Sequence, residues 1–302
     1  MLQKVHPQAR SKTRHFDHAV QPHLLMCEPA HFAINYAINP WMEPAKWAAA
    51  AHAVAEQQWA GLQEALRASG AVIDYVAPQA GLPDLVFTAN AAVVLDGVAL
   101  LARFRHPERQ GEEPVFAAAF AGLRERGLIE RTVTLPDGVV MEGAGDCLFD
   151  EARNLFWIGF GQRSERRAVD VVAETFGLGV VPLQLVDPRF YHLDTAFCPL
   201  PTGDVIYHAG AFTDEGRLEI AKRVPESKRI VLSDEEAVQF SANAVCVGRT
   251  IVMSRCTDGL RKRLERRGYQ VAAAPLDTFL GSGGSAACLT LRLDRRSART
   301  AT

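Results

Sequence analysis

Cys288 is the residue whose surroundings most suggest covalent chemistry. It follows a run of small residues, GSGGSAA (281–287), and precedes the apolar sequence LTLRL (289–293). Glycines let a backbone turn sharply or approach another group closely, and a strand after them would hold the thiol in place. A buried core cysteine would look similar, because free cysteine is among the most buried residue types. On this segment alone, a nucleophile and a core thiol are both open interpretations.

Four polar residues before Cys288 recur at nearly constant intervals. Asn90, Glu142, His192, Asn243 and Cys288 are separated by steps of 52, 50, 51 and 45 residues. If repeated modules surround an axis, these positions converge at its centre. A carboxylate, an imidazole and a thiol in one pocket form a set of nucleophile, base and orienting group. The spacing therefore predicts Cys288 as a nucleophile, with His192 and Glu142 as its acid/base pair.

The segments around His192 and Glu142 also allow simpler interpretations. A lone histidine is usually a hydrogen-bonded part of the core. Asp194, however, lies two residues after His192, and in a strand both side chains would project from the same face. That pattern favours a polar pocket. Glu142, in MEGAGD, could instead cap a turn, and its neighbours Gly143 and Gly145 suit either an ordinary loop or a close approach to a ligand.

Four other polar residues could bind a substrate. Asn90 interrupts an apolar segment, VFTANAAVV, that we expect to be a strand, where a buried amide needs partners. Asn39 precedes a proline, so it could be only a turn residue. Arg109 and Arg163 follow the first two predicted hairpins in corresponding places. Each could be solvated, or could hold an anionic group of a substrate.

The elements that must position these residues recur in a fixed order. Helical patterns occupy 45–70, 114–127, 165–177, 215–224 and 257–268. Strand pairs occupy 85–103, 147–160, 195–210 and 243–254, the first of them turning at Asp96-Gly97. A late strand at 287–293 could pair with an early one at 23–29 and bring the chain ends together. A helix followed by two strands, repeated about five times, predicts an α/β radial or solenoid array.

The composition excludes several classes of function. The net charge is −2 without a basic stripe, so no nucleic-acid partner is expected. No apolar run approaches the roughly 18 residues of a membrane span. None of the six cysteines forms a C-x-x-C pair, which argues against a zinc site and favours reduced thiols in the cytoplasm. We expect a flexible tail at 1–22, one catalytic domain at 23–295, a short tail at 296–302 and a possible homo-oligomer.

Four motifs, FTAN, EGAGD, YHLDTAF and GGSAACLT, together resemble the guanidino-modifying enzyme superfamily. That group includes arginine deiminases, dimethylarginine dimethylaminohydrolases and amidinotransferases. The resemblance covers roughly residues 24 to 293 and implies a five-bladed αββ propeller, the pentein fold, with pseudo-five-fold symmetry. Within the group, the segments MCEPAHFAINYAINPWM and FYHLDTAFCPL are most similar to arginine dihydrolases. One departure is that the family's usual EGGD reads EGAGD here.

The resemblance also implies roles for individual residues. It makes Cys288 the nucleophile, His192 the acid/base and Glu142 the carboxylate partner of His192. Asp194 would hold the guanidino nitrogens, and Arg109 and Arg163 would hold the substrate carboxylate. The remaining expected substrate-binding residues are Asn243 and the two asparagines that distinguish the dihydrolases, Asn39 and Asn90. No metal or organic cofactor is expected, and no second, ornithine-processing domain is expected within these 302 residues.

The implied reaction converts arginine to ornithine, carbon dioxide and two ammonia through a thiouronium intermediate. Several alternatives stay open. A deiminase would stop at citrulline, a dimethylarginine dimethylaminohydrolase would release a larger amine, and an amidinotransferase would use an amine acceptor in place of water. A propeller that serves only as a binding scaffold is a further class, but the coincidence of Cys288, His192 and Glu142 argues against it.

Overall fold

Five three-stranded sheets make up the fold. The computed structural model describes residues 21–48 and 50–300, so the predicted tail at 1–22 lies outside the described residues except for its last two. The sheets have the strand orders β3(Ala92–Leu95)-β4(Val98–Leu101)-β5(Arg131–Val133), β6(Cys147–Asp150)-β7(Leu155–Phe160)-β8(Gly179–Gln184), β9(Phe197–Pro199)-β10(Val205–Tyr207)-β11(Arg229–Val231), β12(Val245–Val247)-β13(Thr250–Met253)-β14(Gln270–Ala273) and β15(Leu291–Arg292)-β1(His23–Cys27)-β2(Val72–Val76).

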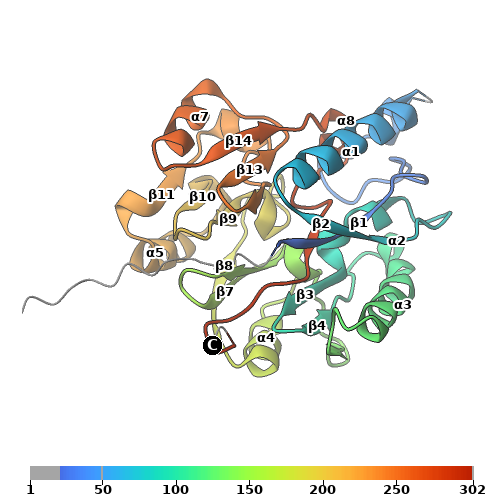
Figure 1. Cartoon of the computed structure of the whole chain (residues 1–302), viewed down its shortest axis with the longest axis horizontal. Helices are drawn as coiled ribbons and strands as arrows, with labels where there is room; N and C mark the ends of the chain where they lie inside the picture. The colour runs from blue at the N-terminus through green and yellow to red at the C-terminus, as the bar shows by residue number, and fades with distance from the viewer. Residues whose placement is uncertain (1–20, 49, 301–302) are drawn as a thin grey trace, which may run out of the picture.

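Every sheet repeats one pairing pattern. The first two strands are antiparallel, and the third runs parallel to the middle strand. In the fifth sheet, β15 near the C-terminus pairs with β1 near the N-terminus, with Leu24 opposite Arg292. The predicted pairing of the early and late strands is therefore confirmed. It joins the two ends of the chain in one sheet, so that the sheets surround a common centre (Figure 1).

A helix connects the middle strand of each sheet to its third strand. Parallel neighbours need such a crossover, because a tight turn cannot reverse the chain far enough. The five long connecting helices are α1(Ala51–Ala68), α3(Glu112–Glu125), α4(Ala168–Phe176), α5(Asp214–Arg223) and α7(Asp258–Glu265). Each lies within a few residues of its predicted place. Shorter helices are α2(Pro107–Gln110), α6(Asp234–Val238) and α8(Asp277–Leu280).

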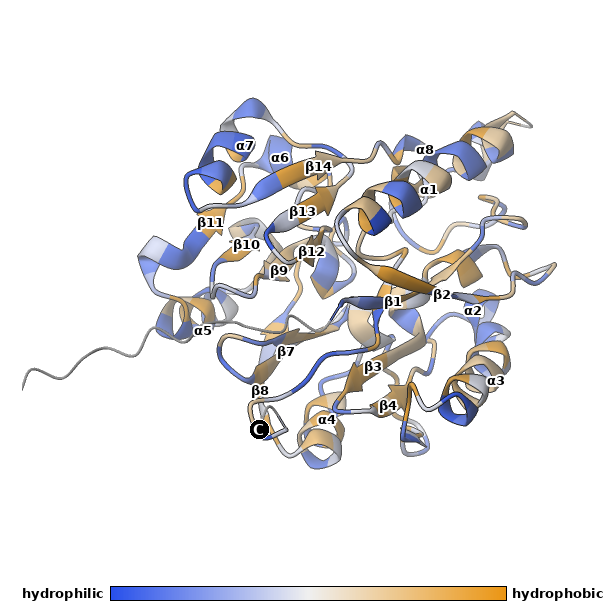
Figure 2. Ribbon diagram, viewed as in Figure 1, coloured by the Kyte–Doolittle hydropathy of each residue, from blue (hydrophilic) through white to orange (hydrophobic). Residues whose placement is uncertain are grey.

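The connecting helices bury one stripe and expose the other. In α7, Leu260 and Leu264 are buried and the intervening positions are charged, while in α4 the buried positions are Ala168, Val172 and Phe176. Figure 2 shows hydrophobic strands inside and hydrophilic stretches on the outer helices α5 and α7. Burial of these apolar stripes against the sheets is the main favourable contribution to packing. Among the described residues, no helix combines the length and apolar composition that crossing a membrane requires.

The third strand of every sheet was not predicted from the sequence. These strands, β2, β5, β8, β11 and β14, are three to six residues long and lie at sheet edges. Their residues alternate irregularly between buried and exposed states, as in β2, where Val72 and Tyr75 are exposed. Short segments of this kind carry too little periodicity to separate a strand from the loop that follows a helix.

The residues predicted to do chemistry precede the inner strands and do not lie within them. Asn90 lies in the 3-10 turn Thr88–Ala91 before β3, and Cys288 lies in a turn before β15. His192 and Asp194 lie at and in the 3-10 turn before β9. The predictions that Asn90 and Cys288 belong to strands, and that His192 and Asp194 share a strand face, were therefore wrong. In each sheet a tight turn delivers the polar side chain to the centre.

The C-terminal residues contact two of the hairpin turns. The amide of Ser297 donates to Oδ1 of Asp96 (2.7 Å), and that of Ala298 donates to Oδ1 of Asn154 (2.8 Å). Asp96 and Asn154 both have positive φ, 52° in each case, which short polar side chains tolerate better than most. Residues 297 and 298 thus link the turn of the first hairpin to the turn of the second.

Candidate active site

Cys288 is buried and held from two sides. Its thiol donates to Oδ2 of Asp194 (3.3 Å) and accepts from Nδ2 of Asn243 (3.1 Å). The side-chain oxygen of Asn243 accepts the backbone N–H of Cys288 (3.1 Å). A single amide therefore fixes both the main chain and the sulfur of this residue. Burial, together with the neighbouring Asp194 carboxyl, raises the pKa of the thiol well above its ordinary value.

Glu142 and His192 form a buried pair. Nε2 of His192 lies 2.8 Å from Oε2 of Glu142, and Nη1 of Arg163 donates to the same oxygen (2.9 Å). Burial on its own would raise the pKa of Glu142. The Arg163 guanidinium and the His192 imidazole outweigh it and hold that pKa well below its usual range. Glu142 is therefore ionised, and it orients the imidazole ring and fixes which nitrogen faces the carboxylate.

Asp146 supports the loop that carries His192. Its Oδ1 accepts the backbone N–H of Leu193 (3.0 Å), and its Oδ2 accepts the hydroxyl of Ser164 (2.6 Å). Burial raises the pKa of Asp146 to about 6. The hydroxyl oxygen of Ser164 in turn accepts a hydrogen bond from the backbone N–H of Glu142 (3.0 Å). Asp146 and Ser164 thus tie the Glu142 turn to the His192 turn.

The two glycines of EGAGD let this turn approach its neighbours. Gly143 has a φ of +62°, and a Cβ there would lie 2.7 Å from the backbone of Asn90. A Cβ on Gly145 would clash with the side-chain amide of Asn90 and lie 3.3 Å from the imidazole of His192. Gly143 and Gly145 thus allow a close approach to protein groups of the site, namely Asn90 and His192. Larger residues at these positions would push the Asn90 and His192 turns apart.

Arg109 and Asn90 form a second buried group. Arg109 donates twice to Glu112 (2.8 and 2.7 Å) and once to Oδ1 of Asn90 (2.8 Å). The amide nitrogen of Asn90 donates to the carbonyl of Glu142 (3.1 Å). Burial disfavours the charged guanidinium, but Glu112 outweighs that effect and raises the pKa of Arg109. The orientation of the Asn90 amide is fixed by a donor on one side and an acceptor on the other.

A small cavity brings the candidates together. Asn39 lines it, donating to the carbonyl of Ser282 (3.0 Å) and accepting the amide of Trp41 (2.9 Å). The lining consists of Ile38, Asn39, Asp84, Phe87, Asn90, Arg109, Arg163, Tyr191, Ser282 and Cys288. The four remaining predicted residues are each hydrogen-bonded to a lining residue or to one another: Glu142, His192, Asp194 and Asn243. All nine predicted residues therefore belong to one connected site.

Comparison with known proteins places the chain in a family. The family described as "N,N dimethylarginine dimethylhydrolase, eukaryotic" matches residues 28–295. This chain is a member of the dimethylarginine dimethylaminohydrolase family. The N(G),N(G)-dimethylarginine dimethylaminohydrolase of Mycobacterium tuberculosis is 37% identical over 89% of this chain and 84% of its own length.

Other family relatives are arginine dihydrolases. The bifunctional arginine dihydrolase/ornithine cyclodeaminase AgrE of Nostoc is 44% identical over 89% of this chain. The chain spans only 37% of the length of that relative. A crystal structure of the N-terminal domain of ArgZ, a cysteine-to-serine mutant of a cyanobacterial arginine dihydrolase bound to substrate, superposes with a TM-score of 0.86. It is 40% identical, and the match covers 91% of this chain and 99% of that domain.

Several residues of the candidate site were not predicted from the sequence. Asp84 and Tyr191 line the cavity, and Glu112 is the buried partner of Arg109. The Arg163 guanidinium lies over the ring of Tyr191, 4.7 Å from its centroid. Asp84 offered a signal, because it is an acidic residue in the apolar segment PDLVF six positions before Asn90. Glu112 offered none, since it lies two residues before the helix predicted at 114–127, where acidic residues are ordinary.

Two buried carboxylate oxygens of the site lack a hydrogen-bond donor within the described part of the chain. Within residues 21–48 and 50–300, no three histidine, cysteine, aspartate or glutamate side chains are arranged to hold a metal ion. Oδ1 of Asp194 and Oδ1 of Asp84 are buried without a hydrogen-bond partner among the described residues. Buried carboxylate oxygens of this kind are costly unless a donor reaches them. A ligand with positively charged N–H groups would supply such donors.

Burial raises the pKa of Asp194 from 3.8 to about 7, which predicts a pH-dependent affinity. A guanidinium binds the ionised carboxylate better than the protonated one. In the Cys288→Ser variant, we expect the affinity for arginine to rise about tenfold per pH unit up to about pH 7 and then to level off. Calorimetric titrations between about pH 5 and 8 measure this. In the double variant that also carries Asp194→Asn, the affinity should not change with pH. If the affinity does not change with pH while Asp194 is present, Asp194 is not the carboxylate that binds the guanidinium.

Proposed function

We propose that this chain is an arginine dihydrolase, a cysteine-dependent hydrolase that converts arginine and two waters to ornithine, carbon dioxide and two ammonia. The observation that carries the proposal is the neutral amide of Asn90 in the cavity beside Cys288, fixed between Arg109 and the Glu142 carbonyl. An amide can donate to a ureido oxygen and also accept from a guanidino nitrogen. The 44% identity to the Nostoc bifunctional dihydrolase supports the same function.

The first step is attack by the Cys288 sulfur on the guanidino carbon. In the empty site the thiol is protonated and donates to Asp194. A bound guanidinium places a positive charge beside the sulfur and favours loss of the thiol proton to water, which leaves the thiolate as the attacking species. Asp194 orients the guanidinium through its ionised carboxylate. The resulting tetrahedral adduct loses ammonia after His192 gives it a proton, which leaves a thiouronium on Cys288.

The second step hydrolyses that thiouronium. His192, held by Glu142, takes a proton from water, and the hydroxide adds to the thiouronium carbon. Loss of the Cys288 thiolate completes the formation of citrulline. In a dihydrolase, citrulline stays in the active site, and Cys288 attacks again, this time at the ureido carbon. The second cycle releases the second ammonia and leaves a thiocarbamate on the sulfur, whose hydrolysis yields ornithine and carbon dioxide.

The α-amino and α-carboxyl groups of the substrate need partners at the other end of the cavity. Asp84 offers a buried oxygen without a partner, and its other oxygen accepts the hydroxyl of Tyr36 (2.8 Å). We assign it the α-ammonium group. Arg109 and Arg163 keep the proposed role of holding the carboxylate. Because each arginine is already paired with a glutamate, it would share its charge between the protein and the substrate.

Hydrolysis of methylated arginines is the second candidate. Two observations favour it: the family description itself and the 37% identity to the Mycobacterium tuberculosis enzyme, of which the match covers 84%. The mechanism is the same up to the first leaving group, which would be dimethylamine. Incubation with arginine and with dimethylarginine, followed by separate assays for ammonia and dimethylamine, decides between them. Faster release of dimethylamine would reject the dihydrolase proposal.

Asn90→Asp is expected to turn the proposed dihydrolase into an enzyme that releases citrulline. The added carboxylate, near Asp194, favours the guanidinium over the neutral ureido group. A change of about 1.4 kcal/mol in that preference alters the partition tenfold. A time course of citrulline, ornithine and ammonia from labelled arginine measures the effect. A wild type that already stops at citrulline would contradict the proposal, whereas Cys288 and His192 would keep their roles.

The proposal also covers the closure of the fold, the cellular location and the oligomeric state. The five sheets around a common centre support a closed five-bladed propeller with pseudo-five-fold symmetry. The composition supports a cytoplasmic location. We also propose that the chain forms a homo-oligomer, which sedimentation or light scattering tests directly.

A further inference from the structure

A second, larger cavity adjoins the candidate active site. The space that it offers to the centres of water-sized probes is about 110 Å³. Asp194 lines this cavity, as do Ala89 and Ala287, the chain neighbours of Asn90 and Cys288. The two cavities are therefore separated by a thin layer of residues that includes Asp194. Apart from Asp194, none of the residues assigned to the reaction lines the second cavity.

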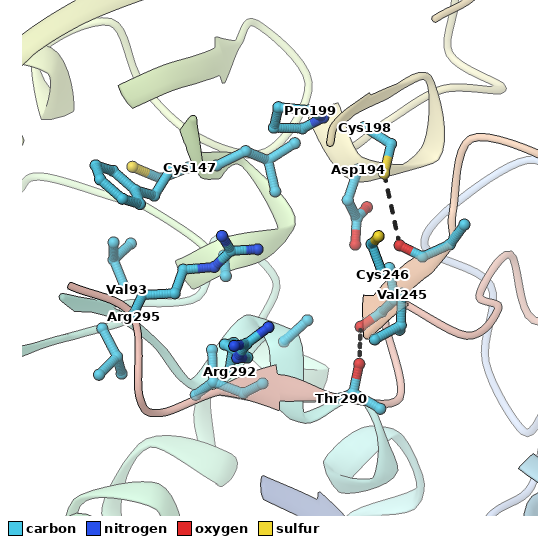
Figure 3. Close-up of a pocket in the computed structure, with 18 of the residues that line it drawn as sticks. Val93, Cys147, Asp194, Cys198, Pro199, Val245, Cys246, Thr290, Arg292 and Arg295 are labelled. Atoms are coloured by element: carbon cyan, nitrogen blue, oxygen red, sulfur yellow. Dashed lines mark hydrogen bonds between the residues drawn. The ribbon is translucent and has the colours of Figure 1, made fainter. Parts of the chain in front are cut away.

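Two arginines near the C-terminus project into this second cavity. Figure 3 shows the guanidinium of Arg295 extending toward the middle of the ring of labelled residues, with that of Arg292 beside it. Arg292 is paired with Asp294, to which its Nη2 donates (2.9 Å). Among the described residues, the side chain of Arg295 makes no hydrogen bond and no ion pair. One guanidinium therefore faces the cavity without a counter-charge in contact.

The surroundings of Arg295 disfavour its charge. Burial lowers the pKa of Arg295, and the neighbouring positive charge of Arg292 lowers it further. Glu151 and Asp294 act in the opposite direction but do not restore it. Arg295 keeps part of its surface accessible to solvent, but a partly buried charge without a partner still carries a desolvation cost. An anion that bound the guanidinium fork would remove this cost.

The walls of the cavity determine what kind of anion fits. They are mostly apolar, and the larger side chains among them are Val93, Leu148, Phe149, Phe156, Phe197 and Leu291. Only one of the two guanidinium charges is unneutralised, and the Asp194 carboxyl is also present. A dianion such as phosphate would leave excess negative charge near apolar walls. A monoanion with a hydrocarbon body satisfies both the charge and the surface.

We propose that this cavity is a binding site for a small monocarboxylic acid with an apolar body, separate from the site that contains Cys288. The carboxylate accepts two hydrogen bonds from the guanidinium of Arg295, and the hydrocarbon part lies against the phenylalanine and valine side chains. Arg292, with one guanidinium nitrogen left over from its pairing with Asp294, flanks the same carboxylate. This inference does not depend on which guanidino compound the enzyme hydrolyses.

Hexanoate is a suitable probe for this site. The protein should be the full chain carrying Cys288→Ser and saturated with arginine, so that the active-site cavity is already filled. We expect calorimetry to show one hexanoate per chain, and Arg295→Gln to weaken its binding at least tenfold. Arg296→Gln, which changes the exposed neighbouring arginine, is the matched control and should bind as tightly as the parent. Circular dichroism establishes that both variants are folded.

Three outcomes would overturn the proposal. They are no hexanoate binding to the parent protein, equal binding by the parent and Arg295→Gln, and tighter binding of inorganic phosphate than of hexanoate. Thermal unfolding adds an independent readout. Without ligand, Arg295→Met should raise Tm by about 2 °C, because it removes an unpaired and partly buried charge. Hexanoate should raise the Tm of the parent and not that of Arg295→Met. A lower Tm for Arg295→Met would mean that the guanidinium has a protein partner, which also contradicts the proposal.

Discussion

Cys288→Ser is expected to abolish turnover, lowering kcat by about 10⁴-fold or more, as the loss of an essential nucleophile usually does. The serine hydroxyl is far less acidic than a thiol, so a bound guanidinium cannot ionise it. The change is small, and the hydroxyl can still donate to Asp194 and accept from Asn243. The variant should therefore fold normally and still bind arginine. Ammonia release and calorimetric binding of arginine measure the two properties separately.

Intact-mass analysis makes the test of Cys288 more specific. Wild-type enzyme quenched in acid during turnover should carry a covalent adduct, and Cys288→Ser should carry none. Cys256→Ser is the matched control, because Cys256 is a partly buried thiol that donates to the carbonyl of Thr257 and lies outside both cavities. It should keep full activity. If Cys288→Ser retained more than a few per cent of wild-type turnover, the sulfur would not be the nucleophile.

His192→Ala is expected to slow turnover by about 10² to 10⁴-fold, the usual range for a lost acid/base group. The reason is that His192 supplies a proton to the leaving ammonia and removes one from water. Its 2.8 Å contact with Glu142 holds the ring for both tasks. Binding of arginine should change little, because Asp194 and the cavity residues remain. Steady-state kcat and KM from ammonia release, compared with wild type, measure the effect.

Two further measurements separate catalysis by His192 from a structural role. His208→Ala removes another buried histidine, which packs against Phe190 outside the cavity of Cys288, and should leave kcat nearly unchanged. Glu142→Gln should lower kcat less than His192→Ala and shift the pH profile, because Glu142 acts through the imidazole. A normal kcat with a raised KM for His192→Ala would instead assign this residue to substrate binding.

Much of the site was predictable because the chain repeats one module. Steps of about fifty residues predicted that Asn90, Glu142, His192, Asn243 and Cys288 would meet. In the structure, hydrogen bonds join Asn90 and His192 to Glu142, and Asn243 to Cys288. Periodicity of this kind depends only on the order of elements, which helix patterns and hairpin turns make visible. The helices and inner hairpins were placed within a few residues for the same reason.

The edge strands and the local conformation at the site were not predictable. The third strand of each sheet is short and half-exposed, so its pairing depends on neighbours that lie elsewhere in the chain. Asn90 and Cys288 were expected in strands, because apolar residues flank them. Both residues lie in turns, because backbone hydrogen bonds between distant segments fix the local conformation. One example is the bond from the Ala89 N–H to the Cys288 carbonyl (3.1 Å).

The sequence by itself determined which residue types could act and that they would meet, because residue identity and spacing are local properties of the chain. Only the tertiary structure decided their states. The protonated thiol of Cys288, the raised pKa of Asp194 and the ionised Glu142 all follow from burial and from charges on other modules. Desolvation and electrostatic interactions depend on distances in space. Those distances exist only after five separate turns have been packed around one centre.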